Sequence, residues 1–122
     1  MFSGRELDVM SALWELGSGT VSDVLNALPD ELAYTTVLTI LQRLEKKGHV
    51  RHESEGQAHR YFPAVEREEA QDSAIRRVTR KLFSDSPELL MNRLVRKGGL
   101  TEEQLRDLRD LLDERLKERG EK

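Results

Sequence analysis

LAYTTVLTILQRLEKKGHV, residues 32–50, is the stretch that decides the fold of this 122-residue chain. Its apolar residues recur every three or four positions, which predicts a helix from about Ala33 to Lys47. Gly48 is the expected end of that helix, because glycine adopts the left-handed conformation that often follows a helix without steric cost. The predicted buried face consists of Val37, Ile40, Leu41 and Leu44.

Two shorter helices are predicted before this stretch. Ser3 and Thr20 are each followed three residues later by an acidic side chain, a pattern typical of a helix start. Apolar residues at helical spacing follow both positions. Gly17 is expected to end the first helix and Pro29 the second, so that three helices fit within the first 48 residues.

The pattern changes after the third helix. HVRHES (49–54) and AHRYFPAV (58–65) are typical of two short strands around a turn at Glu55-Gly56. Helical spacing then returns and continues to the end of the chain, interrupted before Pro87 and at Gly98-Gly99. The predicted order is therefore three helices, a two-stranded hairpin and three further helices.

This order of elements predicts a mainly α protein with a small β-hairpin. The first three helices and the hairpin have the arrangement of a winged helix-turn-helix, which we assign to residues 1–65. The remaining three helices form a second domain, which we assign to residues 66–122 and to dimerisation.

In a winged helix, the third helix presents its outer face to the DNA major groove. Threonine and glutamine side chains can bond to bases there, and basic side chains can bind phosphates. A solvated face with basic residues near a helix C-terminus is the alternative interpretation, and winged helices also serve as protein-binding modules. The candidate DNA-binding residues of this helix are Thr35, Thr36, Leu38, Thr39, Gln42, Arg43 and Lys46.

The hairpin supplies further candidates for DNA binding. Arg60 is expected to reach a backbone phosphate, while Tyr61 or Phe62 packs on the helices. The alternative is an ion pair between Arg60 and Glu53 or Glu55 across the hairpin. The wing candidates are Arg51, His59 and Arg60.

The three histidines of this region raise the question of a metal site. His49, His52 and His59 could converge across the hairpin, but positions 49 and 52 point to opposite faces of a regular strand. We therefore expect solvated wing histidines and no metal site.

The last three helices carry apolar stripes and almost no aromatic residues. About 56 residues of this kind would be marginally stable alone, so we expect them to pack against a second copy of the chain. The resulting homodimer would hold two recognition helices one DNA turn apart, or a multiple of it, to match an inverted repeat in double-stranded DNA. The candidate dimerisation residues are Ile75, Val78, Leu90, Leu94, Leu105, Leu108, Leu112 and Leu116.

Composition excludes several classes of protein. The chain has no cysteine, so it can form neither a disulfide framework nor a thiolate metal site. No apolar run approaches the roughly 20 residues of a membrane span, and the N-terminus lacks a secretory signal pattern. No glycine-rich phosphate loop or nucleophile elbow is present. We therefore expect a cytoplasmic, non-enzymatic protein without cofactors or stable membrane association.

Charge is unevenly distributed along the chain. The net charge of −3 argues by itself against a general polyanion binder. Residues 32–63, however, contain five basic and three acidic side chains together with all three histidines. The locally basic part of the chain is thus compact and coincides with the predicted recognition helix and wing.

LAYTTVLTILQRLEKKGHV, followed by AHRYFPAVEREE, closely resembles the penicillinase and methicillin-resistance repressor (BlaI/MecI) family. The similarity extends upstream to ELDVMSALWELGSGTVSDV and downstream to LTEEQLRDLRDLLDE. The resemblance implies a dimeric bacterial repressor of the antibiotic-response type, with an N-terminal winged helix and a C-terminal dimerisation domain. In members of the family, a membrane sensor triggers proteolysis within the C-terminal domain, so a sensor-linked protease is a further implied partner.

The chain departs from the family pattern at three places. It lacks the C-terminal cysteine cluster of the copper-responsive relatives, so copper sensing of that kind is not expected. Gln57 stands where a basic residue often follows the wing glycine. Arg93 and Leu94 occupy the place of the Asn-Phe bond that the sensor-linked protease cuts, which makes them a candidate but altered cleavage site. A repressor relieved by a small ligand, and a winged-helix protein-interaction module without DNA affinity, are the alternatives.

Overall fold

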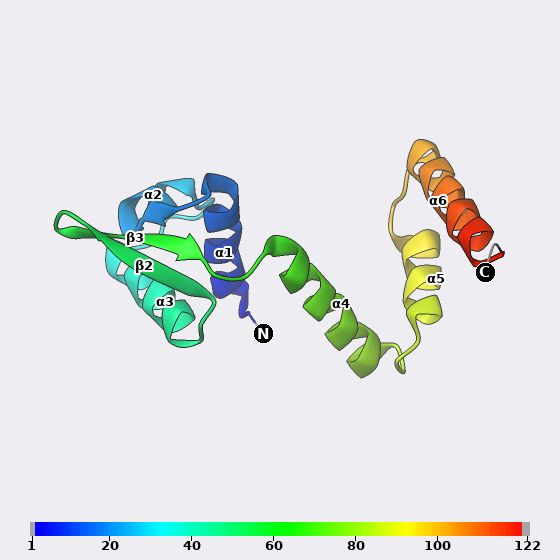
Figure 1. The fold of residues 1–122 in the computed structure, drawn as a ribbon, viewed down its shortest axis with the longest axis horizontal. Helices are drawn as coiled ribbons and strands as arrows, with labels where there is room; N and C mark the ends of the chain where they lie inside the picture. The colour runs from blue at the N-terminus through cyan, green and yellow to red at the C-terminus, as the bar shows by residue number, and fades with distance from the viewer. Residues whose placement is uncertain (1, 121–122) are drawn as a thin grey trace. The chain divides into compact units, whose positions relative to one another are not determined.

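The computed structural model describes residues 2–120, which form two compact units, one ending at Ala74 and one beginning at Ile75 (Figure 1). This division falls inside a helix, nine residues after the predicted domain boundary. The assignment of residues 1–65 to DNA binding and of residues 66–122 to dimerisation stays a prediction. The first unit contains α1 (Gly4–Leu16), β1 (Gly19–Thr20), α2 (Val21–Ala27), α3 (Tyr34–Lys46), β2 (Val50–Glu55) and β3 (Ala58–Pro63). α4 (Arg67–Leu82) begins in the first unit, and the second unit also contains α5 (Pro87–Lys97) and α6 (Glu102–Gly120).

The predicted helix boundaries of the first unit are confirmed. Both capping boxes are formed: the Glu6 amide donates to the Ser3 hydroxyl at 3.2 Å, and the Asp23 amide donates to that of Thr20 at 3.2 Å. α1 ends at Gly17, whose φ is +84°.

The predicted two-stranded hairpin is one strand short of the observed sheet. β1 pairs antiparallel with β3, so that the sheet has the order β1-β3-β2. β1 contains only Gly19 and Thr20, which lie opposite Tyr61 and Arg60. Two residues are too few to show the alternation that identifies a strand in a sequence.

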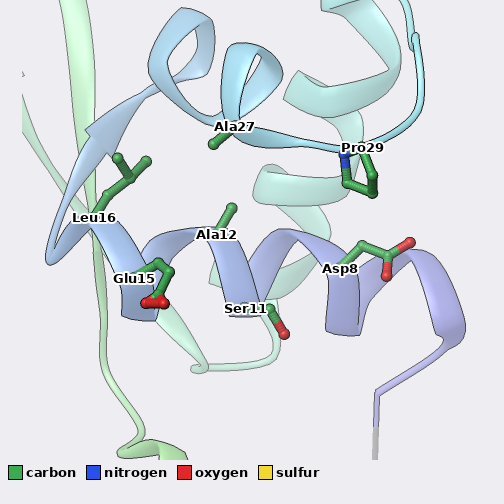
Figure 2. A pocket seen from close by; sticks show the side chains of 7 residues that line it. All are labelled: Asp8, Ser11, Ala12, Glu15, Leu16, Ala27 and Pro29. Atoms are coloured by element: carbon green, nitrogen blue, oxygen red, sulfur yellow. The ribbon is translucent and has the colours of Figure 1, made fainter.

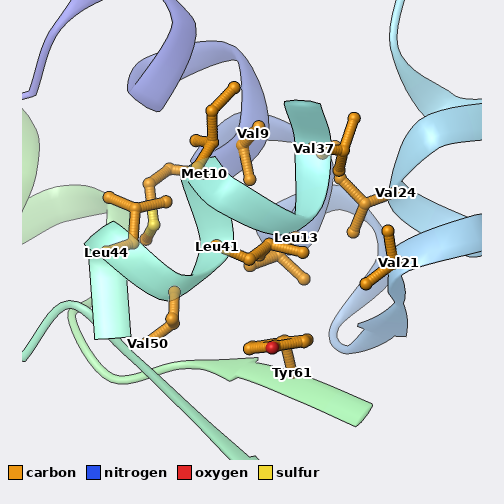
Figure 3. Close-up of a cluster of buried hydrophobic side chains, with 12 residues drawn as sticks. Val9, Met10, Leu13, Val21, Val24, Val37, Leu41, Leu44, Val50 and Tyr61 are labelled. Carbon is orange, nitrogen blue, oxygen red and sulfur yellow. The ribbon is translucent and has the colours of Figure 1, made fainter. Parts of the chain in front are cut away.

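The core of the first unit is built around α3 (Figure 3). All four residues of its predicted apolar stripe are buried, and α1 and α2 cover them from the side opposite the outer face. Tyr61 of β3, with 1% of its surface exposed, closes the core on the side of the sheet, which confirms the expectation that Tyr61 or Phe62 packs on the helices. The buried apolar side chains are Val9, Met10, Ala12, Leu13, Val21, Val24, Val37, Ile40, Leu41, Leu44, Val50 and Tyr61.

Glu6 is a buried charge in the first unit, with 1% of its surface exposed. The Ser3 amide donates to its carboxylate at 2.8 Å, and the Lys47 ammonium donates to the same carboxylate at 2.9 Å. The amide hydrogen bond and the ion pair outweigh burial and lower the pKa of Glu6 to about 2. This pair joins the start of α1 to the residue that follows α3, and so fixes the end of α3 against the core.

The second unit has almost no core of its own. Within residues 75–120, Thr79 is the one buried residue, and its hydroxyl donates to the Ile75 carbonyl at 2.6 Å. The N-termini of α5 and α6 are nevertheless capped. Ser86 is the N-cap of α5 and is followed by Pro87, and Thr101 forms a capping box with Gln104 at the start of α6. Across residues 2–120, no helix is both long and apolar enough to span a membrane.

Glu6→Gln should destabilise the first unit by about 2 kcal/mol at pH 7, because it leaves the Lys47 ammonium without its charged partner. The folded-state pKa of Glu6 lies below its ordinary value of 4.5, so its stabilising effect is present above pH 4.5 and is lost as the pH falls towards 2. Urea unfolding at pH 7 and pH 3 should therefore show a stability difference between wild type and variant that shrinks at the lower pH. Glu15→Gln, at an exposed position on the same helix, is the control and should leave the stability unchanged at both pH values.

Candidate nucleic-acid interface

The outer face of α3 presents most of the predicted DNA-binding residues to solvent. The burial of the opposite stripe determines this orientation, because the two faces of one helix lie on opposite sides. Leu38 differs from the others: it is half-buried and packs against the edge of the core. The exposed candidates are Thr35, Thr36, Thr39, Gln42, Arg43 and Lys46.

Arg43 and Lys46 occupy the last turn of α3. Across residues 2–120, neither takes part in an ion pair, whereas Lys47, Arg51 and Arg60 all do. Their positive charges therefore remain available to an anion outside the protein. Phosphate oxygens of a nucleic acid backbone are suitable ligands for two such side chains beside a row of hydroxyl groups.

Thr39 has one of its bonding groups already engaged. Its hydroxyl donates to the Thr35 carbonyl at 2.9 Å, one turn earlier in α3. The oxygen can still accept a hydrogen bond from a base, and the methyl group stays exposed. The Thr36 hydroxyl forms no hydrogen bond within residues 2–120 and can act as donor or acceptor.

The two predicted wing arginines are held by carboxylates of the protein. Arg51 donates to Glu53 at 2.9 Å, and its guanidinium lies 4.3 Å from the centre of the Phe62 ring. Arg60 donates to Glu55 at 2.5 Å, and this hydrogen bond raises the pKa of the arginine. The ion pair across the hairpin that was the alternative for Arg60 is thus present, and its phosphate contact stays a prediction.

The three histidines separate into two environments. His49 lies edge-on against Phe2, with ring centres 4.7 Å apart, whereas His52 stacks on His59 at 4.2 Å. Alternation along the strand produces this separation, and across residues 2–120 no group of three ligands could hold a metal ion. His52 and His59 are exposed, as expected of solvated wing histidines, while His49 is half-buried, and the carboxylate of Glu45 lies 2.5 Å from the Nδ1 atom of His52.

A groove of the first unit lies away from these residues. It has a volume of about 530 Å³ and is formed by α1, α2 and the residues after α2 (Figure 2). Two of its side chains are carboxylates, which would repel a phosphate backbone. None of the predicted DNA-binding residues lines it; its lining residues are Asp8, Ser11, Ala12, Glu15, Leu16, Ala27 and Pro29.

The predicted dimerisation residues are accessible in the second unit. Leu90 and Leu108 are half-buried, and the others expose between 39% and 68% of their surface. The candidate cleavage residues Arg93 and Leu94 are exposed on α5, inside the helix. Cleavage between them would require α5 to open locally.

Sequence reasoning missed three side chains that hold the wing. Glu45 contacts His52, while Ser18 and Asp23 lie 3.2 Å and 3.8 Å from the Arg60 guanidinium. These residues come from the end of α3 and from the short segment around β1. A signal in the sequence would have been the acidic residue at position 45, the one acid in a predicted recognition helix.

The family model of the penicillinase repressor matches residues 2–114 of the chain. The transcriptional regulator BlaI of Mycobacterium tuberculosis is 46% identical over 67 residues, which are 52% of this chain and 49% of that protein. The penicillinase repressor of Bacillus licheniformis is 24% identical over 114 residues, which are 92% of this chain and 89% of that repressor. The chain thus aligns with about half the length of the mycobacterial relative and with most of the Bacillus one.

A solved structure extends the likeness to three dimensions. The solution structure of the DNA-binding domain of the repressor BlaI matches with a TM-score of 0.51 at 32% identity. The match covers 55% of this chain and 84% of that domain. It confirms the predicted winged helix-turn-helix.

Proposed function

The chain belongs to the penicillinase repressor family of transcriptional regulators, a family without enzymatic activity, and from this membership we propose that it represses transcription as a homodimer on an inverted-repeat operator. The observation that carries the proposal is the outer face of α3. Hydroxyl and amide groups that can bond to bases lie there beside Arg43 and Lys46, which form no ion pair within residues 2–120. Because the proposed ligand is chromosomal DNA, we expect the protein to act in the cytoplasm.

Recognition of one half-site is assigned to α3 and the wing. Thr36, Thr39 and Gln42 would bond to base edges in the major groove, while Arg43 and Lys46 would bind the phosphates on either side. Arg60 would bind a phosphate only by releasing or sharing its carboxylate partner. Its contribution to affinity should therefore be smaller than that of Arg43.

Dimerisation is supported by the exposed apolar surface of the second unit. Leu112 exposes 58% of its surface and Leu116 exposes 68%, and covering such residues stabilises an assembly by roughly 25 cal/mol per Å². Once one subunit binds its half-site, the linked partner binds the second half-site at a high effective concentration. Operator affinity then depends on dimer affinity.

Relief of repression follows from this dependence. Any event that weakens the dimer removes the advantage of the second half-site, and cleavage near Arg93 and Leu94 by a sensor-linked protease is one such event. A small ligand that separates the subunits would have the same effect on operator affinity. Both events act through loss of the dimer. Purified variants that weaken the dimer test this common step, because they should bind the operator weakly without any cleavage or ligand.

The first test is selection of the purified protein on randomised duplex DNA at physiological salt. The expected result is an inverted repeat with half-sites one helical turn apart or a multiple of it. A folded dimer that enriches no sequence would contradict the proposal and would favour a winged-helix module that binds protein.

Arg43→Ala should weaken binding to all sequences and reduce the salt dependence of log affinity by about 0.9 for each phosphate that the variant no longer neutralises. Fluorescence anisotropy titrations at several salt concentrations measure this slope. Arg5→Ala removes a basic residue from α1, and its slope should equal that of wild type. Equal slopes for Arg43→Ala and wild type would remove Arg43 from the interface.

Thr36→Ala should change the base preferred at one position of each half-site, because a base-edge contact is worth about 1–3 kcal/mol of discrimination. Repeating the selection with the variant measures this change. Ser22→Ala, on the exposed face of α2, should return the wild-type consensus. The wild-type consensus from Thr36→Ala would exclude Thr36 from base recognition.

Leu112→Asp should convert the dimer to monomer, because it places a charge in the proposed apolar interface. The side chain is exposed within its own chain, so the fold of the subunit should be retained. Sedimentation equilibrium measures the mass, and circular dichroism confirms that the helices persist. Glu114→Ala on the opposite face of α6 should remain dimeric, and an unchanged mass for Leu112→Asp would contradict the proposed interface.

A further inference from the structure

A carboxylate of the recognition helix and an imidazole of the wing lie in direct contact. His52 Nδ1 of β2 is 2.5 Å from Glu45 Oε2 near the end of α3. Both side chains are about one-third exposed, at 34% and 31%. This contact therefore lies at the surface where the recognition helix and the wing meet.

Two aromatic neighbours hold the imidazole of His52 in place. The ring of His59 from β3 stacks on it with centres 4.2 Å apart and planes 12° apart. The ring of Tyr61, which belongs to the buried core, lies 5.7 Å from His52 and 6.4 Å from His59. The contact with Glu45 is thus connected through aromatic rings to the core beneath the sheet.

The base of the wing is held through β3, where Tyr61 is buried and Arg60 lies 3.2 Å from Ser18 and 3.8 Å from Asp23 of α2. Further out, all residues from Arg51 to His59 are exposed, and Arg51 pairs with Glu53 of the hairpin itself. Val50 is the buried residue of β2 and lies at the end of the strand far from the turn. The contact between Glu45 and His52 thus joins the exposed part of β2 to α3, and without it that part of the wing would be held through β3 alone.

Glu45 is also unexpected on a surface that faces DNA. It is the single acidic residue of α3, and a carboxylate near a phosphate backbone weakens binding unless a donor compensates its charge. His52 supplies such a donor. The pair therefore serves two purposes: it gives the carboxylate a hydrogen-bond partner within the protein, and it joins two elements that must contact DNA together.

We propose that Glu45 and His52 are positioning residues for DNA binding, whose hydrogen bond fixes the wing at the angle to α3 that the DNA backbone requires. This inference rests on the proposed function. It predicts a sign that simple electrostatics does not: removal of the negative charge at position 45 should weaken DNA binding, because β2 then loses its side-chain contact with α3.

The test uses full-length protein and a fluorescein-labelled duplex that carries the inverted repeat recovered by selection. Glu45→Gln and His52→Ala should each weaken binding by about tenfold per half-site, the effect of removing one charge-assisted hydrogen bond. The double variant should be no weaker than either single variant, because the two residues act through each other. His52→Asn, whose amide can donate from near the position of Nδ1, should recover most of the affinity.

Glu53→Gln is the matched control. It removes one carboxylate from the same hairpin, 64% exposed and paired with Arg51, without touching His52. It should bind DNA as tightly as wild type or more tightly. Thermal unfolding midpoints of all variants should match wild type, and if His52→Ala failed to fold, Glu45→Gln and His52→Asn would still decide the outcome.

Several outcomes would overturn the inference. The contact between Glu45 and His52 would not position the wing if Glu45→Gln bound DNA as tightly as Glu53→Gln. Additive effects in the double variant would lead to the same conclusion. A new base preference in Glu45→Gln would show that Glu45 contacts a base instead. If wild-type protein bound no duplex in the selection, the proposed function would fail and this inference with it, whereas normal wild-type binding with unaffected variants would refute the inference alone.

Discussion

Burial of one face of α3 is the constraint on which the rest of the first unit depends. Val37, Leu41 and Leu44 have no exposed surface, so the helix cannot rotate about its axis without moving apolar groups into water. The outer face is presented as a consequence of this burial. Tyr61 extends the same constraint to the sheet, because the strand that buries its ring also carries the wing.

The sequence predicted what depends on periodicity and local capping, and it predicted less of what depends on contacts between elements. The α3 stripe, the caps at Ser3 and Thr20 and the winged-helix order are all confirmed. β1 was not predicted, because two residues are too few to show the alternation of apolar and polar side chains that identifies a strand. The contact of Glu45 with His52, and the choice of Glu55 over Glu53 as partner of Arg60, depend on how a helix and two strands approach each other, which no local pattern encodes.

The two units differ in how completely they satisfy their own apolar residues. The first buries twelve apolar side chains, whereas residues 75–120 bury none and leave leucines exposed along three helices. In the proposed dimer, a unit with so little interior of its own would gain most of its stability from association. Folding of the second unit and assembly of the protein are therefore expected to be one process, with a stability that depends on protein concentration.

Three of the five basic residues between positions 32 and 63 have carboxylate partners inside the protein: Lys47 with Glu6, Arg51 with Glu53 and Arg60 with Glu55. Within this segment Arg43 and Lys46 are the basic side chains that form no ion pair among residues 2–120, in a chain whose net charge is −3. Non-specific affinity for DNA is an electrostatic quantity, so we expect the recognition helix and wing of the proposed repressor to hold random sequence weakly. Fewer molecules would then bind the rest of the genome, and a smaller number would occupy the operators.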